Sequence, residues 1–215
     1  MKNWNKKQFF LSTFVLFLPM IAGFLLWDQL PDRLITHWNA AGEADGSMGK
    51  LAAIVTIPAF IFLMHLFCLF MASLDNDAQK QSSKVMLIVY WVMPATSLFA
   101  GFSVLGKGLN TGFRPFSLMS LLVGVLFVFI GSCLPGIAPN KTLGIRLPWT
   151  LKSEENWRKT HRMAGPVWIA GGLILILCAF LPERLQLIIF SSVLLILCIA
   201  STVYSYMLHK KEQRP

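Results

Sequence analysis

The sequence predicts an all-α membrane protein, a bundle of six transmembrane helices. Of its 215 residues, 55% are hydrophobic and 13% are charged, and its mean hydropathy is +0.62, which is too apolar for a soluble domain of this size. Six windows without Asp, Glu, Lys or Arg are long enough to cross a bilayer. They are Phe9–Trp27, Leu51–Ser73, Val85–Leu105, Phe116–Leu134, Ala164–Leu181 and Leu187–Leu208.

The first window follows three lysines, as the apolar core of a secretory signal would. It is long for such a core, it ends in Trp27, and Ala22-Gly23-Phe24 does not form a small-x-small cleavage site. A retained first helix is therefore expected.

Prolines and small residues indicate how the other helices pack. Pro19, Pro58 and Pro94 lie inside the first three windows, where each removes one helical hydrogen bond. Small residues recur at helical spacing in the fourth and fifth windows, which favours close helix packing over a pore lining. These residues are Ser117, Ser120, Gly124, Gly131, Ala164, Gly171 and Cys178. The short segment 182–186 predicts that the last two helices form an antiparallel hairpin.

The basic residues predict the topology, because cytoplasmic loops of membrane proteins are rich in Lys and Arg. With both termini in the cytoplasm, 14 of the 19 basic residues lie inside and Arg33, Lys50, Lys107, Arg114 and Arg184 lie outside. The long loop 28–50 is then extracytoplasmic, and the long loop 135–163 is cytoplasmic.

The formal net charge of +9 does not indicate direct nucleic-acid binding, since the basic residues flank predicted spans and form no aromatic-interleaved patch. Cys68, Cys133, Cys178 and Cys198 all lie within spans and have neither zinc-site nor redox spacing. We therefore expect no cofactor and no metal site.

His65 is the ionisable side chain deepest within a predicted span. An unpaired polar group in hydrocarbon is costly, so we expect a hydrogen bond from neutral His65 to a carbonyl or hydroxyl on a neighbouring helix. A proton relay is the alternative, but no span supplies an acidic partner.

The outer loop contains the Pro, Asn and Asp-Gly signals of turns. Its candidate functional residues are His37, Trp38, Asn39, Glu43 and Asp45. One histidine and two carboxylates have no diagnostic metal spacing, so a structural turn network is favoured over a metal site, with Trp38 at the membrane interface.

The inner loop predicts a short amphipathic helix at the membrane surface. Ser153 is a suitable N-cap, and Glu154 and Glu155 favour the first turn. The pairs Glu154–Arg158 and Glu155–Lys159 have ion-pair spacing, and Trp157, His161 and Ala164 share the opposite face. We expect this helix to turn into the fifth span at Gly165-Pro166.

Before that helix lies the run 144–150, Gly-Ile-Arg-Leu-Pro-Trp-Thr. Gly144, Arg146, Pro148 and Trp149 suggest a docking surface, because Arg146 has no acidic neighbour within four residues and tryptophan is a frequent binding anchor. The alternative is that the loop packs against the helices or against anionic lipid headgroups.

Residues 143–151, with Trp157 and His161-Arg162, resemble the signature loop of the SdpI family of bacterial toxin-immunity and signalling membrane proteins. The outer Leu30-Pro31 and Thr36-His37-Trp38-Asn39 segments resemble the small uncharacterised domain common in the N-terminal half of such proteins. The resemblance divides the chain into an N-terminal membrane region, 1–82, and an SdpI-like region, 83–215.

The resemblance implies a non-enzymatic protein of the bacterial cytoplasmic membrane. The best-known family member gives immunity to a secreted peptide toxin and sequesters a small transcriptional repressor at the membrane when toxin is present. By analogy, loop 28–50 would meet the toxin. The inner docking residues would be Gly144, Arg146, Pro148, Trp149, Trp157, His161 and Arg162.

Two other functional classes fit less well. Glu154-Glu155 followed by Lys159 resembles the Glu-Glu-x-x-x-Arg motif of intramembrane prenyl-protein endopeptidases, but lysine replaces arginine and the pair lies in a loop. A small transporter would need intramembrane charge pairs or broken helices in matching halves. The sequence contains neither.

Overall fold

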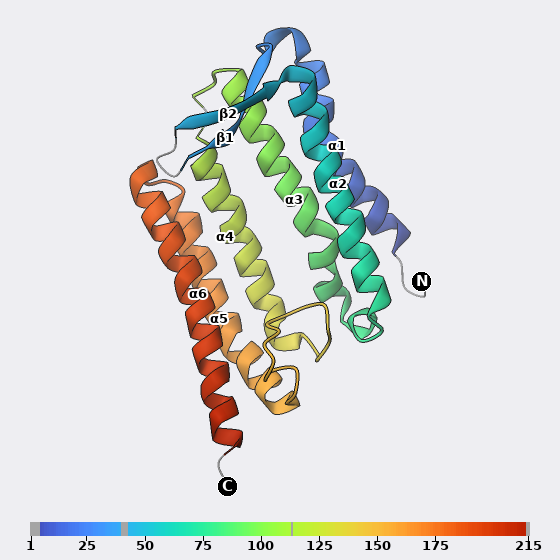
Figure 1. Ribbon diagram of the computed structural model, residues 1–215, viewed down its shortest axis with the longest axis vertical. Coiled ribbons are helices and arrows are strands. Elements are labelled where there is room, and N and C mark those ends of the chain that lie inside the picture. Colours follow the sequence, from blue (N-terminus) through green and yellow to red (C-terminus); the bar gives the residue numbers. More distant parts are fainter. Residues whose placement is uncertain (1–4, 40–42, 113, 214–215) are drawn as a thin grey trace. The chain divides into compact units, whose positions relative to one another are not determined.

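The computed structural model describes residues 5–39, 43–112 and 114–213. It contains six helices long and apolar enough to cross a membrane, which confirms the predicted all-α, multi-pass architecture (Figure 1). They are α1 (Lys6–Leu25), α2 (Lys50–Leu74), α3 (Ser83–Gly108), α4 (Pro115–Cys133), α5 (Glu154–Cys178) and α6 (Glu183–Glu212). Short 3-10 helices η1 (Trp27–Gln29), η2 (Ala78–Lys80) and η3 (Leu134–Gly136) lie between them.

The chain forms two compact units. The first contains the described residues up to Leu69 together with Val89–Met119, and the second contains Phe70–Ile88 and the described residues from Ser120 onward. Helices α2, α3 and α4 therefore each contribute to both units. The division at residue 82 that the resemblance suggested remains a prediction.

The first unit contains a feature that the sequence analysis missed, an antiparallel hairpin of β1 (Arg33–Trp38) and β2 (Ala44–Gly49). Asp45-Gly46 was expected to form a turn, but these residues lie within β2, and Gly46 pairs with His37. A side chain at position 46 would come within 2.9 Å of the His37 Cβ, so the glycine permits this pairing. Irregular register on both sides of His37 obscures the alternation that identifies strands.

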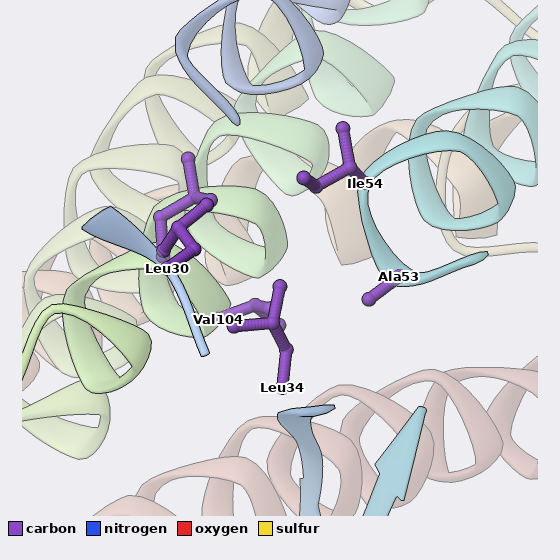
Figure 2. Close-up of a cluster of buried hydrophobic side chains, with 6 residues drawn as sticks. Leu30, Leu34, Ala53, Ile54 and Val104 are labelled. Atoms are coloured by element: carbon purple, nitrogen blue, oxygen red, sulfur yellow. The ribbon is translucent and has the colours of Figure 1, made fainter. Parts of the chain in front are cut away.

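The core of the first unit lies beneath this hairpin. Leu30 and Leu34 point toward Ala53 and Ile54 of α2 and toward Val104 of α3 (Figure 2), and Leu105 completes the buried cluster. Gly101 of α3 lies so close to Pro19 of α1 that an added Cβ would be 2.2 Å from the proline ring. The expected interior prolines of α1, α2 and α3 are all present within their helices.

In the second unit, α5 and α6 form the predicted antiparallel hairpin (Figure 1). Small residues bring α4 against α5, since a Cβ added to Gly124 or Gly131 would be 2.7 Å from the carbonyl oxygen of Gly172 or Gly165, respectively. This confirms close helix packing as the role of those glycines.

The expected turn at Gly165-Pro166 is wrong, because α5 runs without interruption from Glu154 to Cys178 and Pro166 lies inside it. The buried stripe of Trp157, His161 and Ala164 continues in helical phase on both sides of the proline, to Gly171, Leu175 and Cys178. Packing of one continuous face therefore outweighs the single hydrogen bond that proline removes.

Candidate functional site

The first candidate site is the segment between η3 and α5, here called the signature loop (137–152). It contains no regular secondary structure, so its backbone needs other hydrogen-bond partners. Asn140, only 4% exposed, supplies several of them. Its Oδ1 accepts the amide hydrogens of Thr142 and Leu143, and its Nδ2 donates to the carbonyls of Ala138 and Leu143 at 2.9 and 3.0 Å. One buried amide thus fixes the first turn of the loop.

Gln81 and Asp75, which precede α3 in the chain, also bond the signature loop. Gln81 pairs with both backbone groups of Ala138, its Oε1 accepting from the N–H and its Nε2 donating to the carbonyl, each at 3.0 Å. Asp75 Oδ2 accepts from the Lys141 N–H at 2.9 Å and the Thr142 hydroxyl at 2.7 Å.

Asp75 also bonds the backbone of the segment that follows it. Its Oδ1 accepts the amide hydrogens of Asp77 and Ala78. Partial burial tends to raise the pKa of this carboxyl, but the hydrogen bonds from Thr142, Ala78, Lys141 and Asp77 together lower its pKa below the ordinary value. These hydrogen bonds, from the signature loop and from the segment between α2 and α3, therefore stabilise the ionised form of Asp75.

The middle of the signature loop packs on the first turns of α5. His161 Nε2 accepts the Ile145 amide hydrogen at 2.9 Å, which leaves its Nδ1–H to donate to the Trp157 carbonyl at 2.8 Å. The imidazole stacks on the Trp157 indole at 4.2 Å, and Trp157 Nε1 donates to the Ile137 carbonyl at 2.7 Å. Gly144 has a φ of +100°, and an added Cβ would be 2.5 Å from His161 Nε2.

The end of the signature loop is held by Thr150 and Trp149. The buried Thr150 hydroxyl accepts from the Leu147 N–H and donates toward the Ile145 and Leu147 carbonyls. Trp149 Nε1 donates to Ser205 Oγ of α6 at 2.9 Å, and its ring packs against Tyr206 and His209 of the same helix. The loop is therefore attached to α6 as well as to α5.

The structure separates the predicted docking residues into two groups. Trp157 and His161 are 1% exposed, and Trp149 is half-buried against α6. Gly144, Arg146, Pro148 and Arg162 remain exposed. One Arg146 guanidinium nitrogen donates to the Lys141 carbonyl. The buried group shapes the loop, and only the exposed group is available to a partner.

A groove of about 500 Å³ adjoins this surface, between Pro135–Pro139 and the first turn of α5. Glu154, Glu155 and Arg158 line it. Ser153 caps α5 as predicted, its hydroxyl accepting from the Asn156 N–H at 3.1 Å, and Glu155 pairs with Lys159 at 2.5 Å. The expected Glu154–Arg158 ion pair is absent from the described contacts of these two residues, and both side chains are exposed.

The candidate residues of segment 28–50 lie on or beside the hairpin. His37 Nδ1 lies 2.6 Å from Asp45 Oδ1, and both are exposed. Asn39 and Glu43 bond one another through the Glu43 N–H and through their side chains. Trp38 is half-buried. These contacts agree with the predicted structural network. Among the described residues, no three His, Cys, Asp or Glu side chains are grouped closely enough to hold a metal ion.

His65 has the partner that was expected. Its Nε2 lies 3.2 Å from Ser12 Oγ of α1, and its fully buried ring stacks on Phe9 at 6.3 Å. Both helices belong to the first unit, where the contact joins α1 to α2.

The sequence analysis did not identify Asn140, Asp75 and Gln81 as residues that hold the signature loop. Asparagine commonly bonds backbone groups two or three residues on, so the loop position of Asn140 was a usable signal. Nothing in the sequence links Asp75 to Thr142, 67 residues away, or Gln81 to Ala138, 57 residues away.

Comparison with known proteins supports the predicted resemblance. Residues 136–205 match the SdpI/YfhL protein family, and residues 14–62 match a domain of unknown function. The first match covers the signature loop, α5 and most of α6, and the second covers the hairpin. Immunity protein SdpI of Bacillus subtilis (strain 168) is 24% identical over 216 residues, covering 95% of this chain and 97% of the relative. No solved structure matches the chain.

Proposed function

We propose that this chain, which is similar to the SdpI/YfhL family through its signature loop, is a membrane immunity protein that protects its cell from a secreted peptide toxin. One observation carries the proposal: the similarity to an immunity protein extends over nearly the full length of both chains. It therefore includes the outer hairpin, the signature loop and all six helices, rather than one shared segment.

The proposed orientation places both termini and the signature loop in the cytoplasm and the hairpin outside. The charge distribution of the sequence supports it, since most basic residues flank the proposed inner ends of the helices. The hairpin, with its exposed His37–Asp45 pair, is then the part that a toxin arriving from outside meets first.

The proposed second role is to hold a small transcriptional repressor at the membrane through the signature loop. Buried contacts from Asn140 and His161 give this loop a defined shape, which a docking surface requires. Its exposed cations suit an acidic partner, with anionic lipid headgroups as the competing ligand. The exposed cations are Lys141, Arg146 and Lys152 of the loop, with Arg158 and Arg162 of the adjoining first turns of α5.

The proposed mechanism of protection is binding rather than cleavage. Glutamate-dependent hydrolysis needs a carboxylate that is free to activate water and a group that assists it. Glu155 is paired with Lys159, and both ring nitrogens of His161 bond the backbone. Glu154 is exposed on the first turn of α5. These positions favour a surface role for the two acids.

The direct test is expression of this chain alone in a bacterium that is sensitive to the peptide toxin secreted by the source organism. We expect survival to rise in proportion to the membrane abundance of the chain, relative to an empty vector. Equal killing of both strains, with the chain abundant in the membrane, would contradict the proposal.

A further inference from the structure

A second cavity, of about 350 Å³, lies under the outer hairpin within the first unit. Its lining is predominantly apolar and aromatic, with Trp38 from β1, Phe99 from α3 and Phe116 from α4. Cavities of this size with apolar walls and a few polar groups are typical of sites for small ligands or single anchoring side chains.

Ser103 of α3 is the unusual member of this lining. It is 1% exposed, yet its hydroxyl has no hydrogen-bond partner among the described residues. Serines in helices commonly bond the carbonyl one turn earlier, as Thr96 of the same helix does to Val92. A buried hydroxyl without a partner is unfavourable, so it points to a ligand that supplies one.

The lining also specifies the chemistry of that ligand. Aromatic walls favour an aromatic ring, since ring pairs add stabilisation beyond the burial of apolar area. The unpartnered Ser103 hydroxyl requires a polar atom on that ring. A tyrosine or tryptophan side chain has both the ring and the polar atom.

We infer that this cavity, here called the hairpin pocket, binds an aromatic side chain, tyrosine or tryptophan, of the peptide toxin. The inference rests on the proposed immunity function and deepens it by naming what the outer surface recognises. His37 and Thr36 line the same cavity, so the exposed hairpin and the pocket form one continuous surface. A saturated lipid chain fits less well, because it leaves the Ser103 hydroxyl unpaired.

The pocket is tested with a photoreactive aromatic probe, N-acetyl-4-benzoylphenylalanine amide, and the full chain in lipid nanodiscs. Benzophenones react readily with methionine, and Met119 lines the pocket. Mass spectrometry should find the adduct at Met119. N-acetyltyrosine amide should compete with labelling, and decanoic acid should not. Labelling elsewhere, or equal competition by decanoic acid, would overturn the inference and favour a lipid site.

Two variants connect the pocket to immunity. Ala100→Leu fills the cavity and should abolish both Met119 labelling and toxin protection, whereas Ala170→Leu, the same change at an exposed position of α5, should preserve both. Ser103→Ala removes only the hydroxyl and should weaken labelling about three- to tenfold.

The outcomes separate the two proposals. If wild type protects cells and Ala100→Leu still protects them after losing Met119 labelling, the pocket is not a toxin site and the immunity function stands. If wild type fails to protect, the immunity function falls, and with it the role of the pocket as a toxin site. If Ala100→Leu does not reach the membrane, Ser103→Ala and the competition with wild type decide the matter.

Discussion

The imidazole of His161 occupies the space that a side chain at Gly144 would need, since an added Cβ would lie 2.5 Å from Nε2. The same nitrogen accepts the amide hydrogen of the next residue, Ile145. Gly144 of the signature loop and His161 of α5 are therefore parts of one contact, in which a neutral ring holds the loop backbone against α5.

Gly144→Ala should destabilise the protein for two reasons, its positive φ and this steric overlap. Gly112→Ala is the matched control, because Gly112 also has a positive φ but has nothing within 4 Å of an added Cβ. We expect about 1–2 kcal/mol from the backbone conformation alone, and a distinctly larger loss for Gly144→Ala. Thermal unfolding of the two purified variants measures the difference in stability. Equal losses of stability would show that His161 moves aside without destabilising the protein.

Asp75→Asn should loosen the signature loop, because an amide nitrogen cannot accept from the Lys141 N–H and the Thr142 hydroxyl as Oδ2 does. The expected loss is about 1.5–3 kcal/mol at neutral pH, as for hydrogen bonds to a charged group. Faster protease cleavage after Lys141 or Arg146 would report it.

The effect of Asp75 should depend on pH in one direction. Because its folded-state pKa lies below the ordinary carboxyl value, its contribution is present above that value and is lost as the pH falls through the folded-state pKa. Wild type and Asp75→Asn should therefore converge in strong acid. If the melting temperatures of wild type and Asp75→Asn differ by the same amount across the acid range, the ionised Asp75 carboxylate does not stabilise the loop as described.

Arg146→Ala and Trp149→Ala should separate docking from folding. Trp149 bonds Ser205 and packs on α6, so its loss should lower membrane abundance, by an expected destabilisation of about 2–3 kcal/mol for a half-buried tryptophan. Arg146 is exposed, and its one bond to the part of the chain that the structure describes is to the Lys141 carbonyl, so Arg146→Ala should preserve abundance and toxin survival and reduce repressor recruitment. Normal recruitment by an abundant Arg146→Ala variant would contradict the docking role.

Reporter fusions test the orientation on which both loop assignments depend. An enzyme active only outside the cytoplasm should be active when fused after residue 40 and silent after residue 150. The reverse pattern would exchange the two surfaces and their proposed partners.

The sequence predicted the architecture because six uncharged apolar windows leave the chain few alternatives in a bilayer. It missed the hairpin, whose register is irregular around His37, and the continuation of α5 through Pro166, which depends on a buried face shared with other helices. In the candidate site, Arg146 and Trp149 were found as unusual residues of one motif. Asp75 and Gln81 were not, because their role arises from contacts with a segment more than 50 residues away.

The fate of the toxin tests the central claim, protection by binding without cleavage, most directly. Cells expressing this chain are challenged with toxin, survivors are counted, and the toxin in the same culture is measured by mass spectrometry. We expect survival with intact toxin recovered, and the same result for Glu154→Ala and Glu155→Ala. Recovery of cleaved toxin from wild-type cultures, with cleavage and survival both lost in either variant, would contradict the account and indicate a protease.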